Sequence, residues 1–321
     1  MLLKAEQDKD YLSSYSIILT VSADSFQRIF LYLIAMKKDI NIILICLSLL
    51  FLLTSCKEKK IKLGKGVSFD KEENIHYGKN SDQIMDLYIP NTKSGKGKEV
   101  FIIIHGGGWR AGDKSQLTFF TLSMMQRFPD YIFVNMNYRL ASETQYGLPN
   151  QINDIKDVSA FLEKKLKYSP KFILLGNSAG AHLSMLYSYK FDTDKKVKAV
   201  INIVGPTDLS DSGFKNYQEY SFVERRLVDP RIPKPGTSRI DFASPVKWIN
   251  KNSPPTLSYY GNSDRVIPSS QGKILDSVLN KNHVIYETYQ FDGGHLDWDR
   301  QPNGEFLINK IEAFLKKTDK K

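Results

Sequence analysis

The chain has 321 residues, of which 41% are hydrophobic and 25% are charged, and this composition suits one or two globular domains with a sizeable core. Its 45 Lys and Arg residues exceed its 35 Asp and Glu residues, which gives a formal net charge of +10. The sequence shows no zinc-ligand spacing or nucleic-acid motif, and this absence argues against a nucleic-acid partner as the explanation of the charge. The basic excess indicates contact with anionic lipid or polysaccharide, or simply a surface kept soluble by its charge.

The N-terminal segment predicts an export signal. Lys37 and Lys38 follow Met36, and a mostly apolar run then extends over residues 40–53. This run is short for a membrane span and typical of a signal peptide. It leads into Leu-Thr-Ser-Cys, which resembles the lipobox of bacterial lipoproteins, and the resemblance implies that Cys56 carries a lipid anchor. An uncleaved membrane helix is the alternative.

These signals divide the chain into four segments. We expect the signal peptide at 36–55, a charged tether at 56–66 and the folded body at 67–321. Residues 1–35 are expected to be an upstream extension that results from a misassigned translation start, with a real extension as the alternative. The body contains no cysteine, which excludes a disulfide framework there. The expected location is the bacterial cell envelope, with the protein anchored to a membrane and facing the periplasm or the outside.

Strand and helix patterns alternate along the body. Strand patterns occur at residues 82–90 (expected at the sheet edge), 99–107, 131–139, 171–177, 196–205, 256–262 and 284–291, and helical spacing occurs at 114–128, 148–169, 179–191 and 304–316. Such alternation predicts an α/β fold, with a mainly parallel sheet of eight strands and helices on both faces. Residues 208–255 lack a clear strand and contain several prolines, so they are expected to form a small cap.

A serine stands between small residues where one predicted strand ends. The stretch GNSAG, residues 176–180, has the spacing G-x-S-x-G between a strand and a helix. Its glycines allow close backbone packing, and its strained turn exposes the hydroxyl above a helix N-terminus. The pattern therefore predicts Ser178 as a nucleophile.

A serine nucleophile needs a base and an acid that orients the base. Of the five histidines, His295 directly follows the last strand, behind two glycines that can aim it, whereas His182 is expected to be structural. Asp264 follows another strand and is the predicted acid, with Asp208 and Asp292 as rivals. The resulting order of serine, aspartate and histidine is typical of α/β-hydrolases.

A glycine loop is expected to stabilise negative charge in the reaction. The stretch IIIHGGGW, residues 102–109, ends a strand in three glycines. The N–H groups of Gly107, Gly108 and Ala179 are predicted to form an oxyanion hole, in which one donor is typically worth roughly 10²–10³ in rate. His105 is expected to brace the loop. A phosphate-binding loop is disfavoured because the P-loop lysine and Ser/Thr are missing.

The ordered motifs HGGGW, NYRL, GNSAG, GNSDRVIP and GGH resemble the α/β-hydrolase esterases of the hormone-sensitive-lipase-like and BD-FAE (bifunctional feruloyl/acetyl-xylan esterase) groups, across about residues 80–317. The resemblance implies carboxylester hydrolysis without a metal or cofactor. It also leaves amide substrates open, because kynurenine-formamidase-like enzymes are among these proteins. Ala181 stands where these groups often have a glycine, a difference expected to be harmless.

One ion pair is predicted near the site. Arg139, in NYRL, ends an apolar strand, where an unpaired charge would be costly, and Asp154 lies in the first turns of the next helix. We therefore expect these two side chains to pair and to fix the loop behind the site.

The leading functional hypothesis is a membrane-anchored serine esterase that acts on small-molecule or saccharide esters. An amidase or peptidase, a catalytically inactive binding lipoprotein and a membrane-lipid lipase are the alternatives. Aromatic residues of the cap could stack on sugar rings or pack the cap onto the body, and packing is preferred. The oligomeric state stays open.

Overall fold

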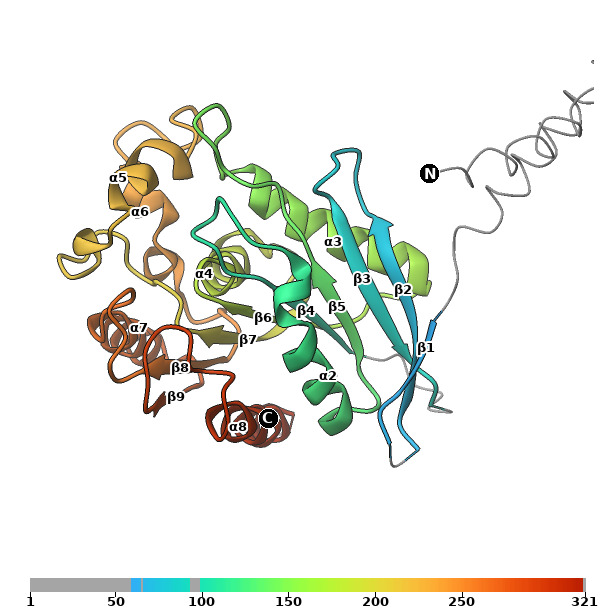
Figure 1. Cartoon of the computed structure of the whole chain (residues 1–321). Coiled ribbons are helices and arrows are strands. Elements are labelled where there is room, and N and C mark those ends of the chain that lie inside the picture. The colour runs from blue at the N-terminus through green and yellow to red at the C-terminus, as the bar shows by residue number, and fades with distance from the viewer. Residues whose placement is uncertain (1–58, 65, 93–98, 320–321) are drawn as a thin grey trace, which may run out of the picture. The chain divides into compact units, whose positions relative to one another are not determined.

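The computed structural model describes residues 59–64, 66–92 and 99–319, in which a nine-stranded sheet has the order β1-β2-β3-β5-β4-β6-β7-β8-β9 (Figure 1). The strands are β1 (Lys59–Lys62), β2 (Ser68–His76), β3 (Ile84–Pro90), β4 (Val100–Ile104), β5 (Ile132–Met136), β6 (Phe172–Asn177), β7 (Val197–Ile203), β8 (Thr256–Gly261) and β9 (Tyr286–Phe291). The pairs β1–β2, β2–β3 and β3–β5 are antiparallel, and the pairs from β5 across to β9 are parallel. The predicted mainly parallel sheet is confirmed.

Two strands at the antiparallel edge correct the sequence prediction. The sheet has nine strands instead of eight, and residues 82–90 correspond to β3, which lies inside β1 and β2. β1 falls within the segment expected to be a tether, 56–66, and β2 is rich in charged residues, with Phe69 fully buried. Hydrogen bonding along an existing edge forms these strands, so their apolar pattern is weak. Cys56, the predicted signal peptide and the upstream extension lie outside the described residues.

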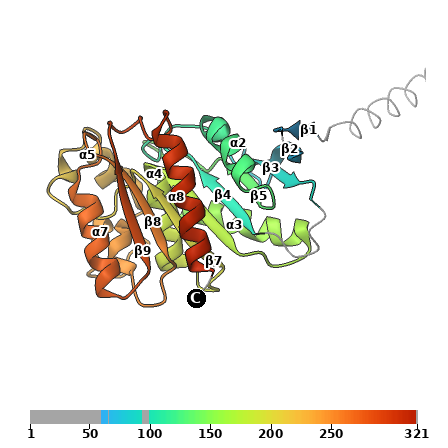
Figure 2. The ribbon, with the colours of Figure 1, turned by 90° about the horizontal axis from the view of Figure 1, so that it is seen from below.

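Helices cover both faces of the sheet, as predicted. One face packs against α3 (Asn150–Leu166), α4 (Ala179–Leu186) and α7 (Ser270–Lys281), and the other packs against α2 (Thr118–Arg127) and α8 (Asn303–Thr318) (Figure 2). Alternate residues of β4 face the two layers, since Ile102 belongs to the first core cluster and Ile103 to the second. Burial on both sides explains why this strand is apolar throughout. None of the helices in the described ranges has the length and apolar character needed to cross a membrane.

The segment between β7 and β8 forms a group of short helices beyond one end of the sheet (Figure 1). They are η3 (Phe214–Asn216), α5 (Tyr220–Phe222), η4 (Val223–Leu227), α6 (Arg239–Ala243) and η5 (Pro245–Trp248). We call this segment, residues 208–255, the cap. Its aromatic side chains Phe214, Phe222 and Phe242 are buried, so these rings pack the cap rather than face solvent.

Candidate active site

Ser178 occupies the tight turn between β6 and α4, with φ of 53° and ψ of −122°. Glycines on either side make this turn possible. A Cβ on Gly180 would lie 2.1 Å from the carbonyl oxygen of Ile104, and a Cβ on Gly176 would lie 2.4 Å from the backbone of Gly180. Both contacts are too close for any side chain, so the G-x-S-x-G spacing is a packing requirement of the turn.

The predicted serine, histidine and aspartate lie in a continuous chain of contacts. The Nε2 of His295 is 3.0 Å from Ser178 Oγ, and its Nδ1 is 2.8 Å from Asp264 Oδ2. These residues follow the ends of β6, β8 and β9, three strands that are distant in sequence. The spacing allows the serine hydroxyl to donate to Nε2 while Nδ1–H donates to the carboxylate, which is the arrangement needed to activate a serine.

The carboxylate of Asp264 is fixed through both of its oxygens. Its Oδ1 accepts the backbone N–H groups of Val266 at 2.8 Å and Ile267 at 2.9 Å, while Oδ2 faces His295. The side chain of Asp264 is only 1% exposed. The short loop after β8 therefore presents one carboxylate oxygen to the imidazole in a defined direction.

The loop that carries His295 depends on a glycine. Gly293 has φ of 150°, and a Cβ there would lie 2.6 Å from the Cβ of Asp297. The N–H of Gly294 donates to the carboxylate of Asp297 at 2.8 Å, which closes the loop on itself. The Gly-Gly pair thus turns the chain back, as the sequence suggested, and places the imidazole beside the serine.

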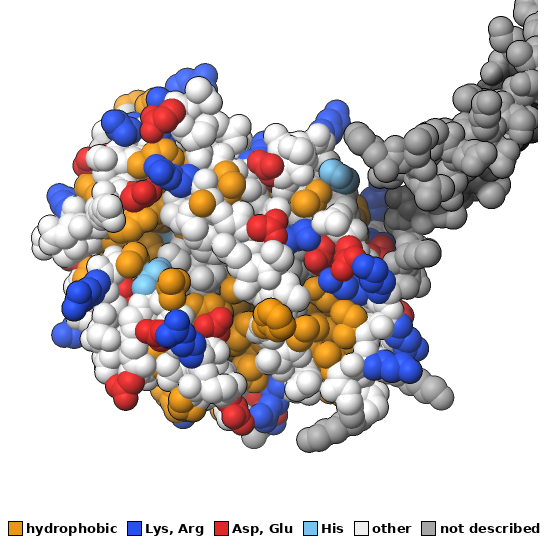
Figure 3. Space-filling view, viewed as in Figure 1, with side chains coloured by type: hydrophobic (Ala, Val, Ile, Leu, Met, Phe, Trp, Pro, Cys, Tyr) orange, Lys and Arg blue, Asp and Glu red, His pale blue; other side chains and the backbone are white. Residues whose placement is uncertain are grey.

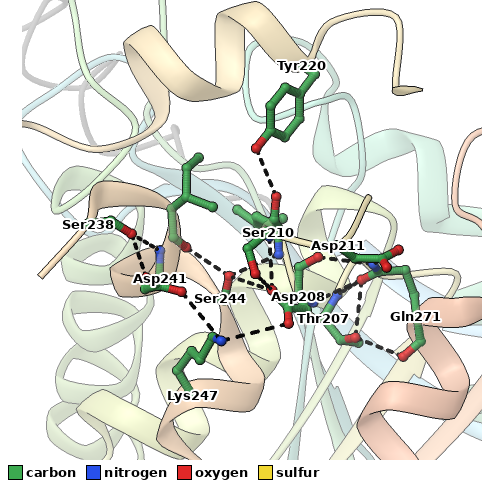
Figure 4. Close-up of polar contacts among 12 residues, drawn as sticks. Thr207, Asp208, Ser210, Asp211, Tyr220, Ser238, Asp241, Ser244, Lys247 and Gln271 are labelled. Atoms are coloured by element: carbon green, nitrogen blue, oxygen red, sulfur yellow. Dashed lines mark hydrogen bonds and ion pairs between the residues drawn. The ribbon is translucent and has the colours of Figure 1, made fainter. Parts of the chain in front are cut away.

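The two rival carboxylates have other partners. Asp208 Oδ1 accepts the N–H and hydroxyl of Ser210 at 2.9 and 2.6 Å, and the N–H of Asp208 donates to Gln271 Oε1 (Figure 4). Asp292 accepts from Asn262 Nδ2 at 2.6 Å. Asp208 therefore fastens the start of the cap to α7, and Asp264 is the carboxylate that contacts His295.

The glycine loop after β4 lies against the serine. A Cβ on Gly106 would stand 3.2 Å from Ser178 Cβ. Gly107 and Gly108 have φ of 115° and 57°, a region that favours glycine, and Ala179 is the first residue of α4. The structure therefore brings the three predicted backbone donors onto the segments that flank the serine hydroxyl.

The side chains of His105 and Tyr138 support the glycine loop. His105 is buried, and its Nδ1 lies 2.7 Å from the carbonyl oxygen of Gly106. The ring of His105 stacks on Tyr138 at 4.4 Å, and the Tyr138 hydroxyl donates to the His105 carbonyl at 3.0 Å. Burial lowers the pKa of His105, which favours the neutral ring. These contacts fit the bracing role that we expected for His105.

The predicted ion pair between Arg139 and Asp154 is confirmed. Arg139 Nη2 and Nε lie 2.6 and 2.8 Å from Asp154 Oδ1, and the backbone N–H of Arg139 lies 2.7 Å from Oδ2. Gln83 also donates to this carboxylate at 2.8 Å. Asp154 is fully buried, so the donors around it satisfy a charge that would otherwise be costly.

Three supporting residues were missed from the sequence, although each stands in a motif that we used. The side chain of Asn177 accepts the N–H of Gly106 at 2.9 Å, and Tyr138 contacts His105. Trp109 Nε1 donates to the buried His182 at 3.1 Å. These residues lie inside GNSAG, NYRL and HGGGW, which indicates that they are close to the active site. The motifs do not reveal which residues they contact.

No group of three or more His, Cys, Asp or Glu side chains is arranged to hold a metal ion within the described ranges.

Known proteins resemble this chain in sequence and in fold. Esterase LipC of Mycobacterium tuberculosis is 28% identical over 215 residues, covering 62% of this chain and 52% of that protein. Kynurenine formamidase avaC of Aspergillus versicolor is 24% identical over 241 residues, covering 63% of this chain and 84% of that protein. A truncated carbohydrate esterase from gut microbiota superposes with a TM-score of 0.62 at 19% identity, covering 78% of this chain and 96% of that one.

The matched region spans about half the length of the mycobacterial esterases LipC and LipQ, at 52% of each. Esterase B of Lactobacillus rhamnosis also superposes, with a TM-score of 0.63 at 19% identity, and these two likenesses establish the α/β-hydrolase fold. The BD-FAE family model matches residues 85–279, which is more than half of the chain. The chain therefore belongs to the BD-FAE family.

Proposed function

We propose that this protein is a serine carboxylester hydrolase that acts on small or carbohydrate-linked acyl esters. The observation that carries the proposal is the hydrogen-bonded chain from Ser178 through His295 to Asp264. The esterase relatives and the carbohydrate esterase with the same fold support this reaction class and substrate type.

In the first half of the proposed reaction, Ser178 Oγ attacks the ester carbonyl carbon while its proton passes to His295 Nε2. Asp264 holds Nδ1–H and stabilises the imidazolium that forms. The carbonyl oxygen becomes negatively charged and accepts hydrogen bonds from the N–H groups of Gly107, Gly108 and Ala179. The tetrahedral intermediate then collapses, the alcohol leaves with the proton from His295, and an acyl-serine remains.

In the second half, water takes the place of the alcohol. His295 Nε2 accepts a proton from the water, whose oxygen attacks the acyl carbon within the same oxyanion hole. Collapse of the second intermediate breaks the bond to Ser178 Oγ, which regains its proton from His295. The carboxylic acid leaves and the starting hydrogen bonds are restored.

An amide hydrolase of the same fold is the second candidate, and the kynurenine formamidase relative favours it. An amide leaving group needs protonation by His295 at nitrogen, and the same residues can supply it. The ratio of kcat/KM for matched ester and amide substrates separates the two candidates. A ratio that favours the amide would replace our first choice.

A fluorophosphonate probe tests the nucleophile directly. The wild-type chain should be labelled covalently at Ser178 and should hydrolyse p-nitrophenyl acetate and acetylated sugars. Ser178→Ala should lose both properties while keeping its far-UV circular dichroism. Equal labelling of both proteins would contradict the assignment, and a wild-type protein that resists the probe would favour a catalytically inactive binding lipoprotein.

We also propose that Cys56 anchors the protein to a membrane of the bacterial envelope, with the body facing the periplasm or the outside. The support is the lipobox-like sequence that ends at Cys56. On the face viewed in Figure 3, basic and acidic side chains are interspersed. The charge of that face is therefore explained by solubility rather than by contact with anionic lipid. Metabolic labelling with a fatty acid should mark the wild-type chain and not Cys56→Ser; labelling of both would exclude Cys56 as the anchor.

A further inference from the structure

A tyrosine of the cap reaches the glycine loop. The position that a Cβ on Gly108 would occupy lies 3.1 Å from the hydroxyl oxygen of Tyr217. Tyr217 directly follows η3, so it comes from a segment far from Gly108 in the sequence. Among the described residues, none forms a hydrogen bond with this hydroxyl. An O–H group with no partner among the residues that the structure describes therefore stands beside the loop that is proposed to bind the oxyanion.

The ring of Tyr217 is held in place by buried neighbours. It stacks on Phe214 with ring centroids 5.5 Å apart and planes at 18°. Phe214 is fully buried and also contacts the ring of Tyr220, whose hydroxyl donates to the Leu209 carbonyl at 3.1 Å. Displacing Tyr217 would break a stacked aromatic contact, which stabilises the packing beyond the area that the two rings bury.

Arg110, which follows the glycine loop, also contacts this part of the cap. Arg110 Nε lies 3.2 Å from a carboxylate oxygen of Glu219, and the guanidinium lies 4.7 Å from the ring centre of Phe222. The ion pair is partly exposed and contributes little energy by itself. Together with the ring contact, it places the residue that follows the glycine loop against the part of the cap that directly follows Tyr217.

We propose that the hydroxyl of Tyr217 donates a hydrogen bond to the substrate oxygen that becomes the oxyanion, next to the backbone N–H of Gly108. This inference rests on the proposed esterase function and adds a side-chain donor from the cap to its site. The proton stays on the phenol throughout, so no covalent bond forms or breaks at Tyr217. The hydrogen bond strengthens as charge develops on the oxygen, and the residue thereby stabilises the transition state.

The ionisation of the phenol agrees with this role. Burial, with a further contribution from the carboxylate of Glu219, raises the pKa of Tyr217, although Arg110 acts in the opposite direction. The group therefore remains a donor at neutral pH. A phenolate would repel the oxyanion, whereas a phenol keeps its proton at neutral pH even at its ordinary pKa of about 10.

Tyr217→Phe tests the proposal because it removes one oxygen atom and keeps the stacked ring. We expect kcat for p-nitrophenyl acetate to fall about tenfold or more while KM changes less than about threefold, as for loss of a transition-state donor. The rate of labelling by a fluorophosphonate should fall by a similar factor, because its phosphoryl oxygen enters the same hole. The matched control is Tyr220→Phe, which removes the same atom from the other tyrosine packed on Phe214 and should keep kcat within about twofold.

The outcomes separate this inference from the proposed function. If Tyr217→Phe keeps the wild-type kcat and labelling rate while Ser178→Ala is inactive, the role of Tyr217 is wrong and the esterase mechanism stands. A change in KM alone, or an equal loss in Tyr220→Phe, would also overturn it. If Ser178→Ala stays active, the proposed function itself fails. Thermal unfolding of each variant verifies that the fold is intact.

Discussion

The indole Nε1 of Trp109 donates to Nδ1 of His182 at 3.1 Å, and the other ring nitrogen of His182 lies 2.7 Å from the carbonyl oxygen of Ala243. These contacts require a neutral imidazole with its proton on Nε2. They connect the glycine loop to α6 of the cap through a fully buried ring. Protonation would bury a charge and place a second N–H against the indole N–H, so the connection depends on a neutral His182.

The stability of the protein should therefore decrease in mild acid. Burial lowers the pKa of His182 from its ordinary 6.5 to about 4, so the unfolded chain takes up a proton before the folded chain does. The stabilisation is complete above pH 6.5, is lost between pH 6.5 and 4, and changes no further below pH 4. The loss from this group is on the order of 3 kcal/mol.

Guanidinium unfolding at several pH values between 7.5 and 4 checks this expectation. His182→Gln is the control, because a glutamine amide can accept and donate hydrogen bonds but does not titrate. The wild-type free energy of unfolding should fall more steeply than that of His182→Gln, while other buried groups such as His105 contribute equally to both. Parallel pH profiles would show that His182 is not the titrating group.

Removal of Ser178 or His295 should abolish most of the activity with little effect on folding. Both side chains lie partly exposed in loops or turns rather than in the core. We expect Ser178→Ala and His295→Ala each to lower kcat by on the order of 10⁴-fold or more, and the double variant to lose little beyond either single one. Steady-state kinetics with p-nitrophenyl acetate measure this, and either variant within tenfold of wild type would exclude that residue.

Asp264→Asn should also be severely impaired, because an amide cannot hold His295 in the tautomer that accepts the serine proton. We expect a fall in kcat on the order of 10³–10⁴-fold at neutral pH. Asp208→Asn provides the matched control, since this carboxylate binds Ser210 and lies outside the contact chain. It should retain kcat within about tenfold and lose about 1 kcal/mol of stability. The reverse ranking of the two variants would make Asp208 the orienting acid.

Activity should be highest for acetyl to butyryl esters. The cap consists of short helices whose aromatic rings are largely packed inside it, so it offers little apolar surface to a long acyl chain. Each methylene that becomes buried is worth about 0.8 kcal/mol, and methylenes left in water contribute none of it. A p-nitrophenyl ester series from acetate to palmitate, below the micelle limit, should show kcat/KM falling beyond roughly six carbons. A maximum at decanoate or longer would favour a lipase.

The site was predictable from the sequence because its residues occupy strand ends within short motifs. Ser178 is identified by its flanking glycines, Asp264 follows a buried strand, and His295 follows the last strand behind two glycines. The carboxyl ends of parallel strands lie at the same end of the sheet, so residues that follow these strands were expected to meet there although they are distant in sequence. The Arg139–Asp154 pair could be predicted for a similar reason, since an arginine at the end of a buried strand needs a partner.

Other features were not predictable because no local pattern encodes them. β1 and β2 are charged strands held by edge pairing, and neither has an apolar strand pattern; β1 lies in the segment that we expected to be a tether. The contacts of Tyr217 and of Ala243 depend on how the cap folds back over the glycine loop. The cap has neither helical nor strand periodicity over most of its length, so which of its residues reach the site follows from packing alone.

The position of β1 has a mechanical consequence. β1 pairs with β2 as an antiparallel hairpin, with Lys59 opposite Lys71 at its open end and Lys62 opposite Ser68 near its turn. A pulling force applied to the chain ahead of Lys59 would separate β1 from β2 one residue pair at a time, starting at the open end of the hairpin. The reactive loops extend from β4, β6, β8 and β9. These strands stay paired with their neighbours when β1, the outermost strand, separates from β2. Tension that entered the chain at Lys59 would thus open this edge of the sheet before it reached the serine.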